Sequence, residues 1–464
     1  MSKTAETNSQ KILERSELEY LTNWFHRSNR KPLMLRGARQ IGKTSLVRML
    51  CSKLKLNLIE VNLEFEEKLR MTFLQMDPDK IIRDIEHHFQ CEFNSSTLLF
   101  IDEIQAVPEA IQGLRYFYEK KPELAVVAAG SLLEFVLSDH GFSMPVGRIE
   151  MFFMGPIKFS DFILARKKKS LHKLFVNYKL KDEMSDLEHQ SLLELFFEYI
   201  SVGGMPEAVR EFVQTNSFSS VRRIQKNIIQ TYRDDFGKYS KKVPLERIDR
   251  VFQFGAFNVA KKVKYSEIDP NEQSKSLILA IELLEKAGVI NRVFHTNASG
   301  IPLGMGKNEK IFKFLFMDVG LVSSLLNLDN IEIQKIYFNP PTDPILLHKG
   351  MISEQFVGQQ LIHRSDIEKP TLFYWLRDQS TQKAEVDFVI ESGLSIIPIE
   401  VKGGKTGTIK SLIQFVKDHK SKLAIKLTTK SPSLLIKEVD QIKVTFVEIP
   451  LYFAERVHEL STEK

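Results

Sequence analysis

A glycine-rich stretch near the N-terminus constrains the fold of this chain more than any other feature. Residues 37–44 read Gly-Ala-Arg-Gln-Ile-Gly-Lys-Thr, after the short apolar stretch 31–36 and before the apolar helical pattern 45–50. A strand, a glycine-rich loop and a helix in this order form a phosphate-binding loop, in which backbone N–H groups and the helix N-terminus face the phosphates. The sequence therefore predicts a nucleotide-binding domain of the α/β class.

The residues of this loop have separate chemical roles. The glycines at both ends allow the backbone to turn its N–H groups toward the phosphates. Lys43 places a point charge at the β- and γ-phosphates, and the Thr44 hydroxyl is a hard oxygen ligand for Mg²⁺. The residues predicted to bind the nucleotide are Gly37, Ala38, Arg39, Gln40, Ile41, Gly42, Lys43, Thr44 and Ser45.

A second motif predicts the carboxylates that this chemistry requires. The hydrophobic stretch 97–101 ends in Asp102 and Glu103. A carboxylate at the carboxyl end of a buried parallel strand lies beside the phosphate-binding loop. We therefore expect Asp102 to hold the Mg²⁺ shell and Glu103 to polarise the attacking water. The alternative is that the pair only caps a helix, because residues 104–108 follow directly.

Two further residues are candidates for catalysis. The apolar stretch 124–130 predicts a third strand that leads to Ser131, whose hydroxyl either senses the γ-phosphate or caps a helix. Arg148 precedes another apolar stretch, 149–154. It either stabilises transition-state charge, in its own site or in that of a neighbouring subunit, or is an ordinary surface arginine.

The middle of the chain contains a pattern typical of a winged helix. In residues 245–318, two helical patterns are followed by two apolar stretches separated by a glycine-rich turn. This order fits a helix-turn-helix variant with a β-hairpin wing. The second helical pattern, 273–287, contains two lysines and two glutamates and is not markedly basic. The segment therefore either reads DNA or serves as a packing module.

Near the C-terminus the sequence predicts a hairpin. The alternating runs 384–391 and 396–402 flank a Ser-Gly-Leu-Ser turn, and Gly393 at its first central position suits type II′ geometry. Side chains at a spacing of two share one face of a strand. Counting outward from the turn therefore puts several charged side chains of both runs on the same face.

Four charged residues face one another in this register. Asp387 is expected opposite Glu400, and Glu385 opposite Lys402. The second pair is a plausible cross-strand salt bridge. The first pair has like charges and should cost stability unless a cation lies between them. The register therefore raises the hypothesis of a cation site on this hairpin.

Taken together, these motifs resemble a known family. The chain is similar to the bacterial and archaeal AAA-type P-loop ATPases that carry a C-terminal DUF4143 region. ATP, rather than GTP, is implied by this resemblance as the nucleotide, with Mg²⁺ as its metal. The stretches that carry it are 37–44, 99–105, 129–131, 147–148, 155–162, 202–207, 313–321 and the Glu-Val-Asp and Glu-Val-Lys runs at 385–387 and 400–402.

The C-terminal acids also resemble the core of the PD-(D/E)xK nucleases. By that resemblance Asp387 and Glu400 hold Mg²⁺, Lys402 orients water or stabilises charge, and Glu354 is the upstream helical acid. Val386 stands where that pattern has a proline before the aspartate. The segment is then an active nuclease, a binding scaffold that retains the fold, or a purely structural domain.

These patterns predict an α/β architecture with four parts. An AAA-type P-loop domain with a parallel sheet is expected first, followed by a helical segment, a winged helix and a small α/β nuclease-like domain. The predicted boundaries are 15–160 for the P-loop domain, 161–240 for the helical segment, 241–330 for the winged helix and 331–464 for the DUF4143 region.

Composition favours a globular protein of the cytoplasm. The 464 residues are 43% hydrophobic and 27% charged, and no apolar run reaches the roughly 18 residues that span a bilayer. The two cysteines, Cys51 and Cys91, form neither a disulfide framework nor a zinc spacing, as expected in a reducing compartment. The net charge of +6 favours an acidic partner, although basic runs such as 166–169 and the lysines from 402 to 426 are usually solvated faces.

The leading hypothesis is an ATPase whose nucleotide state controls a nucleic-acid-associated C-terminal half. Its predicted catalytic residues are Lys43, Glu103, Ser131 and Arg148. One alternative is a slow ATPase switch that binds a protein partner, and another is an ATP-gated, metal-dependent nuclease. DNA, RNA and a second copy of the chain are the candidate partners, and no membrane partner is expected.

Overall fold

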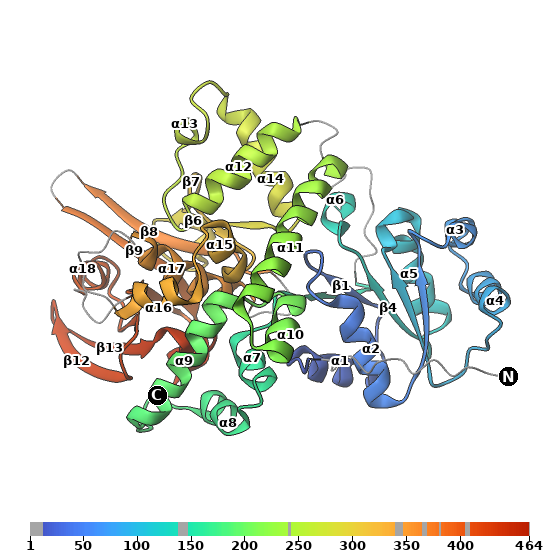
Figure 1. The fold of residues 1–464 in the computed structure, drawn as a ribbon, viewed down its shortest axis with the longest axis horizontal. Coiled ribbons are helices and arrows are strands. Elements are labelled where there is room, and N and C mark those ends of the chain that lie inside the picture. The colour runs from blue at the N-terminus through green and yellow to red at the C-terminus, as the bar shows by residue number, and fades with distance from the viewer. Residues whose placement is uncertain are drawn as a thin grey trace. The chain divides into compact units, whose positions relative to one another are not determined.

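The computed structural model divides the chain into two compact units, one ending at Met154 and the other beginning at Gly155. Each unit has its own sheet (Figure 1). The structure describes residues 13–137, 147–239, 243–338, 347–363, 369–379, 382–403 and 409–463.

The first unit is built on a five-stranded parallel sheet with strand order β2-β3-β4-β1-β5. Alternate strand residues pack against the helices α3, α4 and α5 in one hydrophobic core. The other residues of β3 and β4 are buried as well, as expected where both faces of a parallel sheet are covered. The elements are α1 Glu17–Phe25, β1 Leu33–Arg36, α2 Lys43–Leu54, β2 Asn57–Asn62, α3 Glu67–Leu74, α4 Pro78–Phe89, β3 Thr97–Asp102, η1 Ile104–Ala106, α5 Pro108–Lys120, β4 Ala125–Ala129, α6 Leu133–Leu137 and β5 Glu150–Phe153.

The second unit contains a mixed eight-stranded sheet with strand order β12-β13-β11-β10-β9-β8-β6-β7. Its strands are β6 Ile290–Thr296, β7 Lys307–Phe316, β8 Leu372–Gln379, β9 Gln382–Ser392, β10 Ser395–Val401, β11 Leu423–Thr428, β12 Ser433–Val439 and β13 Ile442–Pro450. Helix α17 packs against β7, β8 and β10, and α18 packs against β9 and β10.

Helices make up most of the remainder of this unit. They are α7 Phe159–Ala165, α8 Lys169–Asn177, α9 Asp186–Val202, α10 Pro206–Thr215, α11 Phe218–Tyr239, α12 Leu245–Phe257, α13 Tyr265–Ile268, α14 Ser274–Lys286, η2 Leu303–Gly306, α15 Val319–Leu325, α16 Asn330–Phe338, α17 Leu347–Ile362, α18 Lys410–His419, η4 Leu451–Arg456 and α19 Val457–Thr462. The α/β class, the parallel sheet, the helical segment and a C-terminal mixed sheet are thus confirmed.

The segment predicted as a winged helix has the expected elements but not the expected independence. Helices α12 and α14 pack together, and β6 and β7 form an antiparallel hairpin. However, β6 also pairs in parallel with β8, so the hairpin extends the sheet of the C-terminal region. A separate winged-helix domain is therefore not confirmed.

Two of the stretches that carry the family resemblance meet at a buried joint. The carboxylate of Asp318 accepts hydrogen bonds from the backbone N–H groups of Gly204, at 2.6 Å, and Leu321, at 3.0 Å. Gly203 has a φ of +75°, and a side chain there would collide with Asp318. The glycines therefore allow α15 to approach the end of α9 closely, which gives both stretches a structural role.

Candidate nucleotide site and buried carboxylate cluster

The phosphate-binding loop connects the end of β1 to the start of α2. Gly37 and Gly42 have φ angles of +137° and +93°. A side chain at Gly37 would also collide with the carbonyl oxygen of Met154 and the side chain of Ile41. Both glycines are thus required by backbone conformation, and Gly37 by close packing as well.

Lys43 lies inside this loop. Its ammonium group donates hydrogen bonds to the carbonyl oxygens of Gly37, at 2.9 Å, and Ala38, at 2.8 Å. Burial lowers the pKa of Lys43 to about 8, and the nearby charges of Glu103 and Asp102 oppose that shift. The lysine is therefore bound by neutral acceptors in a site that would favour an anion.

The loop is linked to the neighbouring strand by a hydrogen bond between two side chains. The Thr44 hydroxyl donates to a carboxylate oxygen of Asp102 at 2.9 Å. Burial raises the pKa of Asp102, and the hydrogen bond from Thr44 opposes that shift. A hydroxyl and a carboxylate together are hard oxygen donors, so this pair has the chemistry that Mg²⁺ prefers.

Glu103 is positioned by residues from three segments. Its carboxylate accepts hydrogen bonds from the hydroxyl of Ser131, at 3.1 Å, and from the side-chain amide of Gln105. The same hydroxyl accepts a hydrogen bond at 3.0 Å from Arg39 of the phosphate-binding loop. Ser131 thus lies between the loop and Glu103, and its sensing of the γ-phosphate stays a prediction.

Gln105 is a site residue that sequence reasoning missed. It lies in the stretch 99–105, but no chemical role was inferred for it. A side chain at Gly130 would collide with the Gln105 amide, which shows how closely β4 approaches this residue. The signal that would have found it is a polar residue two positions after Glu103, within the short 3₁₀ turn that follows β3.

Arg148 is not brought to this site within its own chain. It precedes β5, whose residues Glu150 and Phe153 pair with Leu33 and Arg36 at opposite ends of β1. Arg148 therefore lies at the amino edge of the parallel sheet, whereas the phosphate-binding loop follows the carboxyl edge. It forms an ion pair at 3.1 Å with Glu119, and its side chain is 46% exposed. This strand polarity argues against a role of Arg148 in its own ATP site, and its role in the site of a neighbouring subunit stays a prediction.

A second group of charged side chains lies in the C-terminal sheet. We call it the carboxylate cluster, and its members are Lys313, Glu354, Glu385, Asp387, Glu400 and Lys402. The observed pairing of Ile399 with Phe388 brings Glu400 to the level of Asp387, as the register counted from Gly393 predicts. Gly393 has a positive φ and Leu394 does not, which agrees with a type II′ turn.

Lys313 of β7 occupies the middle of this cluster. Its ammonium nitrogen lies 3.1 Å from Glu354, 2.5 Å from Glu385 and 3.8 Å from Asp387. Its side chain is only 4% exposed. Burial alone would lower the pKa of Lys313, but the charges of the three carboxylates raise it above the usual range.

Lys402 pairs with Glu400 rather than with Glu385. Its ammonium nitrogen lies 2.5 Å from one Glu400 oxygen, and the other oxygen of that carboxylate is buried without a hydrogen-bond partner. Burial raises the pKa of Glu400 to about 7 and that of Glu354 to about 8, and the charge of Asp387 adds to both shifts. The predicted salt bridge between Glu385 and Lys402 is thus replaced by two other lysine–carboxylate contacts.

The predicted metal site at Glu354, Asp387 and Glu400 with Lys402 is corrected by this geometry. Among the described residues, no three acidic, histidine or cysteine side chains are arranged to hold a metal ion. The physical reason is that Lys313 supplies the positive charge between Glu354 and Asp387.

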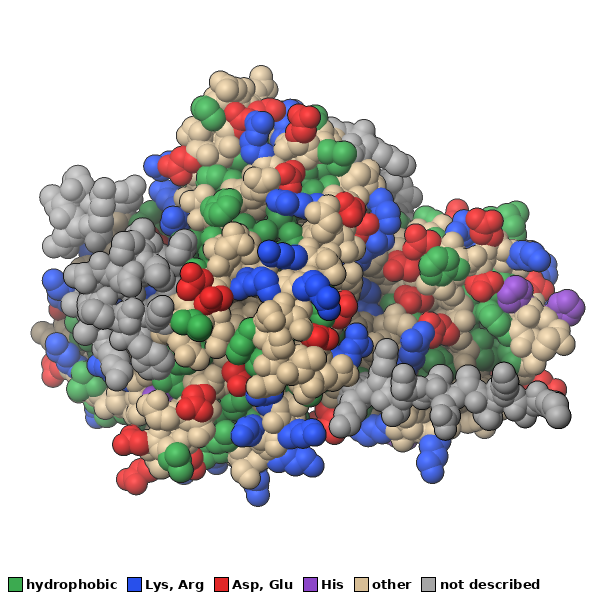
Figure 2. Space-filling view, viewed as in Figure 1, with side chains coloured by type: hydrophobic (Ala, Val, Ile, Leu, Met, Phe, Trp, Pro, Cys, Tyr) green, Lys and Arg blue, Asp and Glu red, His purple; other side chains and the backbone are tan. Residues whose placement is uncertain are grey.

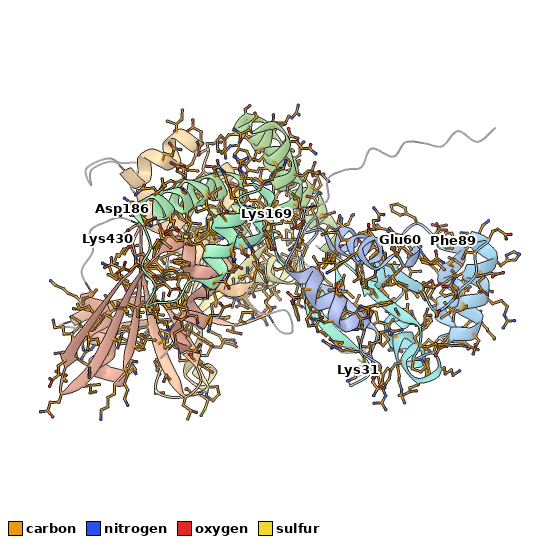
Figure 3. All side chains as sticks on the ribbon, turned by 90° about the horizontal axis from the view of Figure 1, so that it is seen from below. Lys31, Glu60, Phe89, Lys169, Asp186 and Lys430 are labelled. Atoms are coloured by element: carbon orange, nitrogen blue, oxygen red, sulfur yellow. The ribbon has the colours of Figure 1, made fainter. Side chains whose placement is uncertain are left out.

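Some residues of the basic runs form ion pairs with acidic side chains. In the C-terminal run, Lys426 pairs with Glu448 and Lys417 with Asp440, and Lys405 lies outside the described residues. In the run 166–169, the arginine pairs with Glu198 and the three lysines are exposed. Figure 3 labels the last of them, Lys169, at the start of α8. On the described part of the face in Figure 2, positive and negative side chains are interspersed.

Comparisons with known proteins agree with the nucleotide-binding class that the loop and sheet define. Residues 29–163 match the family described as AAA domain, residues 349–452 match the domain of unknown function DUF4143, and residues 193–332 match the domain of unknown function DUF8612. The chain therefore contains an AAA domain followed by a C-terminal DUF4143 domain, which confirms the resemblance to AAA-type P-loop ATPases that carry a DUF4143 region. A search of curated proteins gives no match.

Solved structures match parts of this chain at low sequence identity. A Walker-type ATPase of Pyrococcus abyssi is 16% identical over 68% of this chain and 97% of its own, with a TM-score of 0.44. PCH-2 of C. elegans is 12% identical over 43% of this chain and 62% of its own, with a TM-score of 0.27. A RuvB mutant of Thermotoga maritima is 14% identical over 46% of this chain and 61% of its own, with a TM-score of 0.25.

Within the described residues, none of the helices has both the length and the apolar character that crossing a membrane requires.

Proposed function

We propose that the first unit binds ATP with Mg²⁺ and hydrolyses it at the carboxyl edge of the five-stranded sheet. The observation that carries this proposal is the 2.9 Å hydrogen bond between Thr44 and Asp102, next to Glu103. It joins the phosphate-binding loop to the strand that supplies both a metal-ligand oxygen and a carboxylate for water. ATP is preferred because the AAA domain family covers this unit.

In the proposed reaction, Lys43 exchanges its two loop carbonyls for the β- and γ-phosphates of the nucleotide. Thr44 and Asp102 would hold Mg²⁺, and the bound ion would supply positive charge for the phosphate oxygens. Glu103 orients the attacking water and accepts its proton. Ser131, which already contacts the loop through Arg39, holds Glu103 and lies where it would sense the γ-phosphate.

A single substitution tests this assignment. Glu103→Gln removes the carboxylate that polarises water and leaves Asp102 in place. We expect unchanged Mg·ATP affinity and a turnover that is at least about 100-fold slower. The matched control is Glu92→Gln on the exposed surface of the same unit, which should leave both quantities unchanged. Loss of affinity together with turnover would move Glu103 into the metal shell, and normal turnover would refute its catalytic role.

We also propose that the nucleotide state of the first unit controls a nucleic-acid-associated second unit. The support is the net charge of +6 and the exposed lysines around α18, namely Lys410, Lys420 and Lys422. Exposed lysines suit a phosphate backbone, and such binding weakens steeply as salt concentration rises. The proposed setting is the cytoplasm, where the free thiols of Cys51 and Cys91 remain reduced.

The test is the ATPase rate with and without single-stranded and double-stranded DNA and RNA, at two salt concentrations. Stimulation that is lost at high salt and in a Lys410→Gln, Lys420→Gln, Lys422→Gln variant supports the proposal. Lys430→Gln is the matched control, because Lys430 is also exposed but follows β11 (Figure 3). An ATPase rate that no nucleic acid changes would refute nucleic-acid control and leave the switch that binds a protein partner.

We propose further that the protein forms a homo-oligomer in which Arg148 serves the ATP site of a neighbour. Its exposure and its place at the sheet edge away from its own loop support this role. The test mixes Arg148→Ala protein with Lys43→Ala protein. Activity that neither parent has is expected in the mixture, because mixed assemblies contain one complete site. No rescue, with a monomer in sedimentation, would refute it.

A further inference from the structure

The carboxylate cluster brings four negatively charged side chains close together. Glu354, Glu385, Asp387 and Glu400 come from α17, β9 and β10, and three of these four side chains are at most 17% exposed. Buried carboxylates of like charge are costly unless cations or protons neutralise them. Because the acids of this segment resemble those of metal-dependent nucleases in sequence, the expected neutralising group is a divalent ion.

The second lysine of the cluster changes this expectation. Lys313 comes from β7, which lies outside the residues that carry the resemblance to the nuclease core. Its ammonium nitrogen is 3.1 Å from one oxygen of Glu354 and 3.8 Å from one oxygen of Asp387. A metal at the usual distance of about 2.1 Å from the same Glu354 oxygen would lie no farther than about 5.2 Å from that nitrogen. Charges of the same sign at such a distance in a buried site repel strongly.

Further contacts stabilise the charged ammonium group of Lys313 in this position. The ammonium group also lies over the ring of Tyr374 at 5.0 Å from the centroid, a favourable cation–π position. Glu385 contacts it at 2.5 Å from the more exposed side of the cluster. With Lys402 held by Glu400, each lysine has a carboxylate partner at hydrogen-bond distance.

We propose that Lys313 is a resident cation that replaces the divalent metal in this nuclease-like centre, so that the second unit binds no metal there and does not cut nucleic acid. The remaining negative charge is balanced by protons, which agrees with the raised pKa values of Glu354, about 8, and Glu400, about 7. The sheet is then a scaffold in which lysines and protons of the chain itself neutralise the carboxylate cluster.

The proposal is tested with Mn²⁺ alone, without nucleotide, by electron paramagnetic resonance on the full chain. Asp387→Asn should leave Mn²⁺ binding of the wild type unchanged, because no ion uses that carboxylate. Lys313→Met should create one new Mn²⁺ site, with affinity at least about 100-fold above the wild type, and adding Asp387→Asn should abolish it. Lys313→Arg, which keeps the charge, and Lys310→Met, an exposed lysine on the same strand, should create no site.

Two results would overturn the proposal. The first is a Mn²⁺ site, or Mn²⁺-dependent cutting of plasmid DNA, in the wild type that Asp387→Asn removes. The second is a folded Lys313→Met protein that gains no Mn²⁺ site, because Lys313 would then not be what keeps the metal out. If Lys313→Met does not fold, the comparison of wild type with Asp387→Asn decides the question alone.

Discussion

The two units each bury a lysine near carboxylates, and the two lysines are held in opposite ways. Lys43 donates to two neutral carbonyl oxygens of its own loop, and burial lowers its pKa to about 8. Lys313 contacts three carboxylates, whose charges outweigh burial and raise its pKa. Neutral acceptors can be exchanged for a ligand's phosphates at small cost, whereas a buried ion pair cannot be broken cheaply. The comparison separates a site built to receive an anion from one that is already neutralised.

The largest expected difference between the two lysines is in stability. Lys313→Met should lower the free energy of unfolding by about 3–5 kcal/mol, because it leaves buried carboxylates without their cation. Lys43→Met should change the same quantity little, since it removes a lysine that burial already disfavours as a charge. Chemical denaturation followed by circular dichroism measures both. Equal losses of unfolding free energy in the two variants would show that the two lysines do not differ in their contribution to stability.

The next effect concerns ligand binding and has the reverse pattern. Lys43→Ala should weaken ATP binding by roughly 10- to 100-fold, the value of a hydrogen bond to a charged group. Lys313→Arg, which keeps its charge, should leave ATP affinity unchanged. Titration with a fluorescent ATP analogue measures both affinities. Normal affinity and turnover in a folded Lys43→Ala protein would contradict the assignment of the phosphate-binding loop.

The sequence allowed the first of these sites to be predicted more fully than the second. The nucleotide site consists of one loop and the ends of adjacent strands, so spacing along the chain places Lys43, Asp102 and Glu103 together. The hairpin register was also predictable, since the pairing depends only on a count from the Gly393 turn.

Lys313 could not be placed because its strand reaches the cluster through the order of a whole sheet. Strand β7 pairs with β6, which pairs in parallel with β8, and neither pairing follows from local spacing. A lysine within the apolar run 311–316 was the available signal, since a charge inside such a strand needs a partner. The sequence could not decide between the alternatives for Arg148 for a related reason, because strand polarity sets the edge of the sheet at which Arg148 lies.

A smaller effect is expected in the pH dependence of stability. The pKa of Glu354 is raised to about 8 by burial first and by the charge of Asp387 next, against Lys313. The folded state therefore holds this proton more tightly, and its stabilising contribution is complete below a pH of about 4.3 and is lost as the pH rises through about 8. Lys43 has the opposite effect on stability, because its pKa is lowered in the folded state. The free energy of unfolding should therefore rise as the pH increases from about 8 to about 10.4.

Denaturation at several pH values tests both slopes. Glu354→Gln should flatten the loss of stability between about pH 5 and 8, by up to about 1.4 kcal/mol per pH unit. The charged groups that interact with Glu354 are Lys313, Glu385, Asp387 and Lys402, and all remain in this variant. Lys43→Met should instead remove a rise above about pH 8. An unchanged slope in Glu354→Gln would mean that another group of the cluster holds the proton.

The smallest expected effect comes from Gln105 and tests whether this residue positions Glu103 in the nucleotide site. Its amide donates to Glu103, and its own carbonyl oxygen is buried without a partner beside Gly130. Gln105→Leu keeps much of the volume and removes the donor, so kcat should fall by roughly 10-fold, the value of one hydrogen bond to a charged group. KM for ATP should stay constant, because Gln105 touches the carboxylate that acts on water and not the phosphate-binding loop. A rise in KM with constant kcat would show that Gln105 only supports packing around β4, and Glu103 would then be positioned by Ser131 alone among the described residues.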